Sequence, residues 1–431
     1  FENNYHNKAG GAFQCGYTRS VSNTNLRFTH CIFNDNHGKL KGGALSLETN
    51  KPWSIDHCEF NNNNATTGGA IFVYRDEDNL HAERGSITNC VFNSNTASSG
   101  KGTIMYINDT IMTEITLDGS NTVTNKGEVG SAIYSECRNL ILSGVRFNFV
   151  STENSQRNFR AAELGDESGT KFINCHFIGT GYTQNKNNEK GQAILANKAS
   201  SVIFEGSTFK DCGDTHNQYV IYSLSKSLEF TSSQVSFTTP TTCSPALHIA
   251  KHSTLILTDS TFKDIHASNA GLSAAIYYQD SVKGNTKDCN VKITGCTFDN
   301  LLSKNGRAGF FKLSQYATIS NCTIKNMPDG SYILTIGHEA KPQGQAILDN
   351  VIFMNNQANC QDNGGGGGIG LWISQTEKYT INECKFINNR NTGNYNGGAL
   401  GYVPDGTKSN SKVALDFIGC YFQDNKVKPT F

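Results

Sequence analysis

Cysteine carries the most reactive side chain in this sequence, and its spacing is regular. Of the 14 cysteines, eight stand two residues before a phenylalanine or, once, an isoleucine. Thiols at one fixed place of a repeat could form a metal array or a disulfide ladder. We favour a stack of buried thiols that act as small apolar side chains, because neighbouring parallel strands hold thiols in poor geometry for a disulfide. The eight are Cys31, Cys58, Cys90, Cys175, Cys296, Cys322, Cys384 and Cys420.

The six remaining cysteines fall outside this position of the repeat. They are better candidates for disulfides between loops. No Cys-x-x-Cys pair exists in the chain, so a zinc site has little support. The six are Cys15, Cys137, Cys212, Cys243, Cys289 and Cys360.

Catalytic carboxylates are the next chemistry to consider, because polysaccharide hydrolases need a pair of them. The chain has no Asp-Asp pair, no Asn-Thr-Asp and no Gly-His-Gly sequence. Its polar clusters are interpreted as solvated loops rather than catalytic or calcium sites. We therefore predict no catalytic residue, no metal site and no cofactor. The clusters are Asp76 to Glu83, Asp211 with Asp214 and His216, and Gly337-His338-Glu339.

A repeat must position these residues. Its first motif is a phenylalanine followed by asparagines, as in Phe33-Asn34-Asp35-Asn36, and it recurs about every 30 residues, a period typical of stacked supersecondary units. In the middle of the chain Phe147, Phe237 and Phe262 continue it, and Ile324 and Val123 fill two gaps. The core ladder predicted from this motif contains Phe33, Phe60, Phe92, Phe177, Phe209, Phe298, Phe353, Phe386 and Phe422.

A second motif, Gly-Gly-Ala-apolar, follows most of these phenylalanines. Clear copies are Gly10 to Phe13, Gly42 to Leu45, Gly68 to Ile71 and Gly397 to Leu400. Around both motifs apolar residues alternate with polar ones, as in Ile87-Thr88-Asn89-Cys90-Val91-Phe92, which is typical of short strands. Short strands at this period, with no room for crossover helices, predict an all-β right-handed parallel β-helix of about fifteen coils. We expect residues 1–431 to form one continuous solenoid, as a fragment of a longer chain.

Each part of the motif has a physical role in such a coil. The phenylalanine and the residue two before it should point into the core. The asparagine two or three residues later should lie in a bend, where it tolerates a left-handed backbone and its amide can bond to the same asparagine one coil away. The paired glycines allow positive φ or close backbone approach at another corner.

The ordered pairing of Phe-x-x-Asn with Gly-Gly-Ala-[Ile/Leu/Val] resembles the repeats of the chlamydial polymorphic outer-membrane proteins and of large surface proteins of some protists. The best copies are Phe33 to Asn36 with Gly42 to Leu45, Phe60 to Asn63 with Gly68 to Ile71, and Phe386 to Asn389 with Gly397 to Leu400. The resemblance implies a surface-exposed β-helix that mediates adhesion or builds an extracellular coat. The family has no known catalytic residues, so none carry over.

Charge and composition exclude other classes of function. The formal net charge is zero, so no basic surface is predicted to bind nucleic acid. No apolar run approaches the roughly 18 residues of a membrane span. We expect an extracellular or cell-surface protein. Three Asn-x-Ser/Thr sequons, at Asn64, Asn108 and Asn321, would be glycosylation sites if a eukaryote secretes the chain.

Three functions remain open. The first is a non-catalytic rod-like segment of an extracellular coat or fibre, whose partner is another copy in end-to-end assembly. The second is an adhesin that binds cell-surface glycans or proteins through lateral loops, at residues 75–85, 152–170, 182–190, 280–290 and 404–412. The third is a polysaccharide-active enzyme. We expect the chain not to be an enzyme.

Overall fold

The computed structural model describes most of the chain between residues 1 and 427. The described residues are 1–16, 25–49, 51–74, 84–108, 114–119, 121–125, 130–149, 158–179, 181–182, 193–212, 219–243, 246–250, 254–267, 274–279, 290–303, 311–313, 316–328, 335–336, 345–358, 370–373, 378–392, 398–399, 401–404 and 414–427. Among them there are strands, bends and turns but no helix long and apolar enough to cross a membrane.

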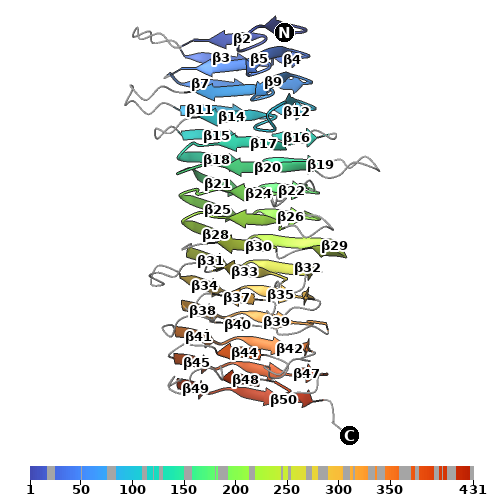
Figure 1. Ribbon diagram of the computed structural model, residues 1–431, viewed down its shortest axis with the longest axis vertical. Coiled ribbons are helices and arrows are strands. Elements are labelled where there is room, and N and C mark those ends of the chain that lie inside the picture. Colours follow the sequence, from blue (N-terminus) through green and yellow to red (C-terminus); the bar gives the residue numbers. More distant parts are fainter. Residues whose placement is uncertain are drawn as a thin grey trace. The chain divides into compact units, whose positions relative to one another are not determined.

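The chain divides into two compact units, residues 1–213 and 214–431. Both units have the same architecture, an all-β right-handed parallel β-helix, which confirms the predicted fold class (Figure 1). That the two units form one continuous solenoid stays a prediction. A full coil contributes strands to sheets that we number 1 to 4 in chain order.

Sheet 1 opens each coil, and its strands pair in parallel from one coil to the next. Among the described residues, the first unit has seven of these strands and the second unit also seven, so the number of coils differs from the predicted value of about fifteen. They are β3 (Leu26–Thr29), β7 (Trp53–Asp56), β11 (Arg84–Thr88), β15 (Glu114–Asp118), β18 (Asn139–Ser143), β21 (Gly169–Ile173) and β25 (Ser201–Glu205), then β28 (Ser227–Thr231), β31 (Thr254–Thr258), β34 (Val291–Thr294), β38 (Tyr316–Ser320), β41 (Gln345–Asp349), β45 (Lys378–Asn382) and β49 (Ala414–Ile418).

Sheet 2 carries the ladder residue of the first motif, which is a phenylalanine in most coils and Val123, Val235 or Ile324 in the others. In the first unit it contains β4 (Ile32–Asn34), β8 (Glu59–Asn61), β12 (Val91–Asn93), β16 (Thr122–Asn125), β19 (Arg146–Phe149), β22 (His176–Ile178) and β26 (Thr208–Lys210). In the second it contains β29 (Gln234–Cys243), β32 (Thr261–Ala267), β35 (Thr297–Asp299), β39 (Thr323–Lys325), β42 (Ile352–Met354), β46 (Lys385–Ile387) and β50 (Tyr421–Gln423), with β36 (Leu302–Ser303) beside β32.

Sheet 3 is short, and sheet 4 follows the glycine corner. Sheet 3 contains β1 (Tyr5–His6), β5 (His37–Lys41), β9 (Asn64–Thr67) and β13 (Thr96–Ala97), then β43 (Gln357–Ala358), β47 (Arg390–Asn391) and β51 (Lys426–Val427). Sheet 4 contains β2 (Phe13–Cys15), β6 (Leu45–Glu48), β10 (Ile71–Tyr74), β14 (Met105–Asn108), β17 (Gly130–Ser135), β20 (Asn158–Leu164) and β24 (Ile194–Ala196), with β23 (Gly181–Tyr182) beside β20. In the second unit it contains β27 (Ile221–Ser223), β30 (Leu247–Ala250), β33 (Ile276–Gln279), β37 (Phe311–Leu313) and β40 (Thr335–Ile336). At the same place in the following coils, β44 (Gly370–Ile373) and β48 (Gly401–Pro404) pair as a separate two-stranded sheet.

The core is a set of side-chain ladders that run from coil to coil. Phe60 is fully buried and stacks on Phe33 and Phe92, with ring centroids 4.7 and 4.9 Å away and planes within 8° of parallel. A second ladder from sheet 1 meets the first edge-on, as Phe172 does with Phe177 at 5.6 Å. Stacked and edge-on rings are the preferred arrangements of aromatic pairs, so the repeat fills its narrow interior with favourable contacts.

Two positions of the phenylalanine ladder differ from the prediction. Phe422 stacks on Phe386, with ring centroids 4.8 Å apart, but it is 50% exposed rather than buried. The other position lies in the middle of the chain. The strand pairing sets Val235, not Phe237, opposite Phe262, and Val235 is buried. The residue two before it, Ser233, occupies the place that cysteine takes in other coils, after the left-handed residue Ser232. The turn at Ser232 therefore fixes the register of this strand. Val235 takes the ladder position, and the nearest phenylalanine, Phe237, lies two residues further along the chain. The side chain of Phe237 lies outside the described residues.

Most coils have two bends that contain a left-handed residue. One joins sheet 1 to sheet 2, with φ of 50° at His57 and 53° at Asn89. The other follows sheet 2, with φ of 51° at Asp35 and 55° at Asn62. Asparagine and aspartate adopt this conformation at low cost because their side chains can bond to the local backbone. This explains why the polar tetrad follows each phenylalanine.

The glycine corner needs both of its glycines for different reasons. Gly42 has φ of 59°, which favours glycine, whereas a Cβ atom on Gly43 would collide with the carbonyl oxygen of Gly69 in the next coil.

We expect Gly43→Ala to lower the free energy of unfolding by about 3 kcal/mol, because the collision is with backbone that cannot move aside. Chemical denaturation measures the loss. Gly16→Ala is the matched control, since a Cβ atom there meets nothing within 4 Å; similar losses in the two variants would contradict the role assigned to this corner.

Candidate functional site

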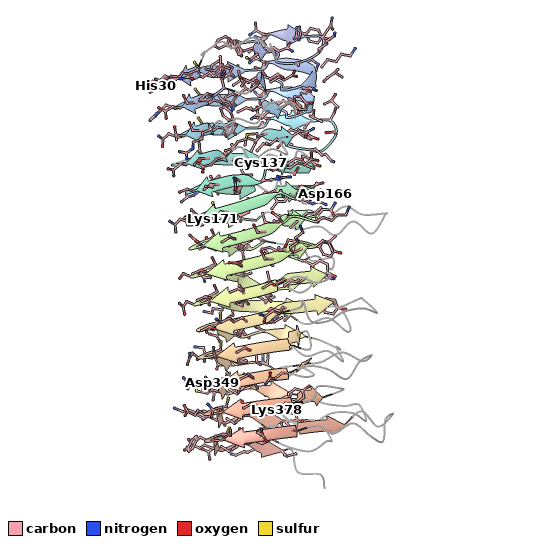
Figure 2. All side chains as sticks on the ribbon, turned by 90° about the vertical axis from the view of Figure 1, so that its left-hand side faces the viewer. His30, Cys137, Asp166, Lys171, Asp349 and Lys378 are labelled. Carbon is pink, nitrogen blue, oxygen red and sulfur yellow. The ribbon has the colours of Figure 1, made fainter. Side chains whose placement is uncertain are left out.

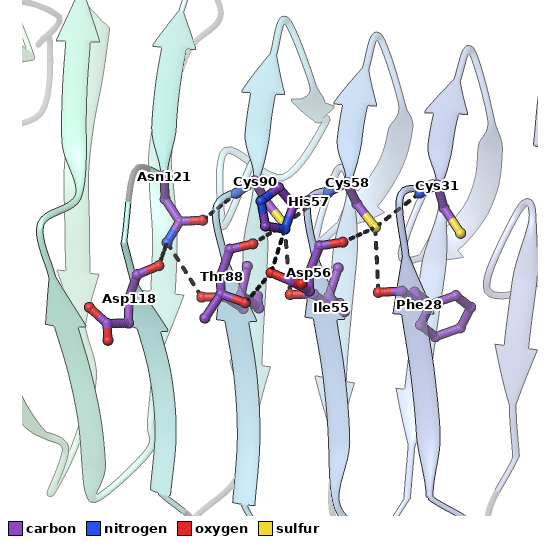
Figure 3. Close-up of polar contacts among 11 residues, drawn as sticks. Phe28, Cys31, Ile55, Asp56, His57, Cys58, Thr88, Cys90, Asp118 and Asn121 are labelled. Atoms are coloured by element: carbon purple, nitrogen blue, oxygen red, sulfur yellow. Dashed lines mark hydrogen bonds and ion pairs between the residues drawn. The ribbon is translucent and has the colours of Figure 1, made fainter.

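The cysteines of the repeat lie in the bend between sheet 1 and sheet 2. A left-handed residue stands before each one. Six of the eight thiols are buried, as predicted, whereas Cys31 and Cys420 are only half-buried. Cys58 and Cys90 are almost completely buried, and Figure 3 shows them with Cys31 in three neighbouring coils. This bend is the best candidate for chemistry in the described residues, because it aligns reactive side chains along the coil axis.

Each thiol takes part in hydrogen bonds between coils. The backbone N–H of Cys31 donates to Sγ of Cys58, and that of Cys58 donates to Sγ of Cys90, both at 3.4 Å (Figure 3). Each of these two thiols donates in turn to carbonyl oxygens of its own coil and the preceding one, as Cys90 does to Thr88 and Ile55 at 3.1 and 3.7 Å. The position therefore contributes one link of a polar ladder inside an otherwise apolar core.

The same position holds other small side chains where cysteine is missing. Serine reproduces the thiol's bonds, as the N–H of Cys175 donates to Oγ of Ser207 at 3.1 Å. The sequence of coils thus creates a run of Cys31, Cys58 and Cys90, pairs Cys296–Cys322 and Cys384–Cys420, and an isolated Cys175. The substitutes are Asn121, Val145, Ser207, Ser233, Ser260 and Val351.

Neighbouring thiols alter one another's acidity. The hydrogen bond with Cys90 lowers the pKa of Cys58 against the effect of burial, and the same contact, with burial, raises the pKa of Cys90. The pair Cys296 and Cys322 behaves likewise, with the pKa of Cys322 lowered. Cys175 lacks such a neighbour, and burial alone raises its pKa to about 12. In these two pairs the pKa of one thiol is thus lowered, whereas burial raises the pKa of Cys384, beside Cys420, to about 12.

On the outer side of the same bend, the carboxylate of Asp56 accepts two hydrogen bonds. Thr88 donates to Oδ1 of Asp56 at 2.6 Å and the imidazole of His57 lies 2.9 Å from the same atom (Figure 3). Both contacts lower the pKa of the exposed Asp56, and the hydrogen bond from Thr88 has the larger effect. A carboxyl whose pKa is depressed by folding stabilises the folded state above its unfolded pKa, and this contribution is lost as the pH falls through the folded pKa.

We expect Thr88→Val to raise the pKa of Asp56 toward the ordinary aspartate value, because the variant removes the strongest donor. The change is measured by following the Asp56 carboxyl carbon by NMR while the pH is lowered. Thr116→Val, at an outward position one strand further on, is the control and should leave that titration unchanged. An unaltered Asp56 titration in Thr88→Val would contradict the assignment.

The other cysteines do not form the predicted loop disulfides where the structure describes them. Cys15, Cys137 and Cys212 are not joined in disulfides, and the last two are buried. Cys212 follows the ladder residue Phe209 by three positions and donates to the carbonyl oxygen of Phe177 at 3.3 Å, so it takes the place of a ladder asparagine rather than a loop position. Cys289, Cys360 and the side chain of Cys243 lie outside the described residues.

The predicted polar clusters contribute little in the part of the chain that the structure describes. Asp211 is a left-handed bend residue, and the rest of its cluster, with Asp76 to His81 and His338, lies outside the described residues. No three His, Cys, Asp or Glu side chains among the described residues are placed to hold a metal ion together. Of the suggested adhesive loops, residues 158–164 form strand β20 instead.

The asparagines of the three sequons differ in how exposed they are. Asn64 and Asn321 are exposed, and Asn108, the last residue of β14, is half-buried. The Oδ1 atom of Asn321 accepts a hydrogen bond from the Asn350 amide at 2.8 Å.

Sequence reasoning missed an aromatic row on the outer face of sheet 4 in the first unit. Tyr106 stacks between Phe72 and Tyr134, with centroids 5.4 and 4.7 Å away, and Lys101 Nζ lies 4.3 Å from the Tyr134 ring. The Tyr134 hydroxyl donates to Glu136 at 2.7 Å, and burial with this bond raises the pKa of the tyrosine. The signal was an aromatic residue directly after Ala70-Ile71 and Ala132-Ile133 of the glycine motif, and Tyr106 follows Ile104-Met105 at the same place.

The second unit carries a different cluster on sheet 4. The buried ring of His248 makes edge contacts with Tyr219, Tyr222 and Tyr277, with centroids 4.4, 4.8 and 4.9 Å away. Burial raises the pKa of Tyr219 and Tyr222. Both sheet 4 clusters combine aromatic rings with polar edges, which is the composition of many recognition surfaces.

Comparison with known proteins supports the fold alone. A family model described as "right handed beta helix region" matches residues 245–403. No curated protein and no solved structure matches the chain.

Proposed function

We propose that this chain is a non-catalytic structural segment of an extracellular surface coat or fibre. The observation that carries the proposal is the polar part of its interior: asparagine and serine side chains bond one coil to the next in both units. Such bonds stiffen a solenoid and leave these groups committed to structure.

Outer side chains support the same role. Ion pairs join successive coils, such as Lys171 with Glu205 at 2.8 Å and Lys378 with Asp416 at 3.4 Å; Figure 2 marks both lysines. The likeness of the repeat to chlamydial and protist surface proteins favours an extracellular location.

The adhesin function is the second candidate. It is favoured by sheet 4 in the first unit, where the half-buried Tyr106 stacks on the buried Tyr134, beside Glu136 and the ion pair of Arg160 with Glu163, whose side-chain atoms lie 2.8 Å apart. Aromatic rings beside charged groups can bind the apolar and polar faces of a sugar or a peptide.

Electron microscopy of the purified chain at neutral pH, with immunogold labelling of intact source cells, separates these functions. Regular filaments and surface label are the expected result. Isolated particles that bind glycan arrays or cells would replace the structural proposal with adhesion. Release of cleaved saccharide products from a polysaccharide would overturn both.

A further inference from the structure

We propose that two cysteine pairs, Cys58–Cys90 in the first unit and Cys296–Cys322 in the second, each bind one soft monovalent metal ion of the Cu(I) or Ag(I) class between their sulfur atoms. All four thiols are buried, with at most 1% of the residue exposed. Each pair occupies one position of the repeat in adjacent coils. The inference does not depend on the proposed function.

Register places the two thiols of each pair face to face along the axis. Asp56 pairs with Thr88 before the first pair and Glu59 with Val91 after it. The same holds around Cys296 and Cys322, where Thr297 pairs with Thr323. Equivalent atoms of paired strands therefore lie about 4.8 Å apart.

That spacing decides between an ion and a disulfide. A metal–thiolate bond is about 2.3 Å long, so a linear sulfur–metal–sulfur unit spans about 4.6 Å and fits with little movement. A disulfide needs its sulfur atoms about 2.05 Å apart, so the coils would have to distort. Soft thiolates select monovalent copper among biological metals, and two ligands suffice for a linear site.

The backbone already provides donors for the charge that binding creates. Sγ of Cys58 and Sγ of Cys90 each accept an N–H bond at 3.4 Å. In the second unit, the N–H of Ser260 donates to Cys296 at 3.5 Å and that of Cys296 to Cys322 at 3.4 Å. Binding replaces two S–H protons, which pass to solvent, by one cation; the metal keeps its oxidation state. The N–H donors stabilise the remaining negative charge of the bis-thiolate.

The chain contains its own control for this geometry. Cys175 has the same depth and the same bend, and its thiol donates to the carbonyl oxygens of Leu142 and Ile173 at 3.4 and 3.5 Å. In the adjacent coils the same position holds Val145 and Ser207, so neither neighbour of Cys175 supplies a second sulfur. Serine occupies this ladder position in three coils, and Cys→Ser variants should therefore fold.

The test titrates the whole chain with silver nitrate in chloride-free buffer, because Ag(I) needs no reductant. The wild type and Cys175→Ser should bind the same number of silver ions. The double variant Cys58→Ser/Cys322→Ser should bind two fewer tightly held ions, counted by native mass spectrometry. Equal binding by all three proteins would overturn the proposal. X-ray absorption at the silver edge, with two equivalents bound to the wild type, needs no variant: two sulfur neighbours are expected, and oxygen or nitrogen neighbours alone would also overturn it.

Discussion

Replacing Phe60 with alanine is expected to lower the free energy of unfolding by about 4 kcal/mol. The ring is fully buried and stacks on Phe33 and Phe92. Alanine removes apolar contact on both sides and leaves a cavity, and the coils above and below are held by backbone hydrogen bonds that keep the cavity from closing. Chemical denaturation followed by circular dichroism measures the loss.

Ile178→Ala is the control for this prediction. Ile178 also lies in a sheet 2 strand, directly after the ladder residue Phe177, but it points outward and is 38% exposed. Its truncation should cost less than about 1 kcal/mol. If the two variants lost similar stability, the phenylalanine ladder would not be the principal source of core stability.

The fold class could be predicted because every coil presents the same environments in the same order. Phe60 must fill the interior, Asn62 must adopt a left-handed backbone, and Gly43 must let the next coil approach. Each requirement excludes most residue types, so the residue type reports the position. The repetition makes the signal cumulative, even though a single motif is weak.

The register of the middle coils could not be predicted in the same way. A ladder position that only needs to be apolar accepts valine as well as phenylalanine, so Val235 carried no distinctive signal beside Phe237. Cys212 and Met327 replace the ladder asparagine, because an apolar side chain at that place also buries well. The alignment of the coils then depends on which residues pair between strands, and loops of unequal length make this register hard to predict from the sequence.

The candidate thiol site was partly visible from the sequence. The eight cysteines share one position, but which of them lie next to another thiol depends on the residue in each intervening coil. Cys175 differs from Cys58 only because Val145 and Ser207 stand beside it. The outer aromatic row escaped prediction for another reason: Tyr106 alternates with core residues in a strand where both faces are partly buried, so period-two patterning does not distinguish them.

Replacing Asn63 with leucine is expected to cost about 3 kcal/mol, although the side chains have similar volume. Asn63 is fully buried; its Oδ1 accepts from the backbone N–H of Asn36 at 3.0 Å and from the Asn36 amide at 2.9 Å, and its Nδ2 donates to the carbonyl oxygen of Phe33 at 3.0 Å. Leucine leaves these partners without their bonds inside the core, and a buried unpaired group costs about 1–3 kcal/mol.

Leu301→Met is the matched control, because Leu301, three residues after Phe298, occupies the same ladder position in the second unit and is already apolar and buried. An apolar exchange of similar volume there should cost less than about 1.5 kcal/mol. Denaturation midpoints of both variants, compared with the wild type, test the difference. Equal losses would mean that the ladder position needs only volume. A larger loss at Asn63 would show that its polarity stabilises a run of coils in which neighbours on both sides, Asn36 and Asn95, are also asparagine.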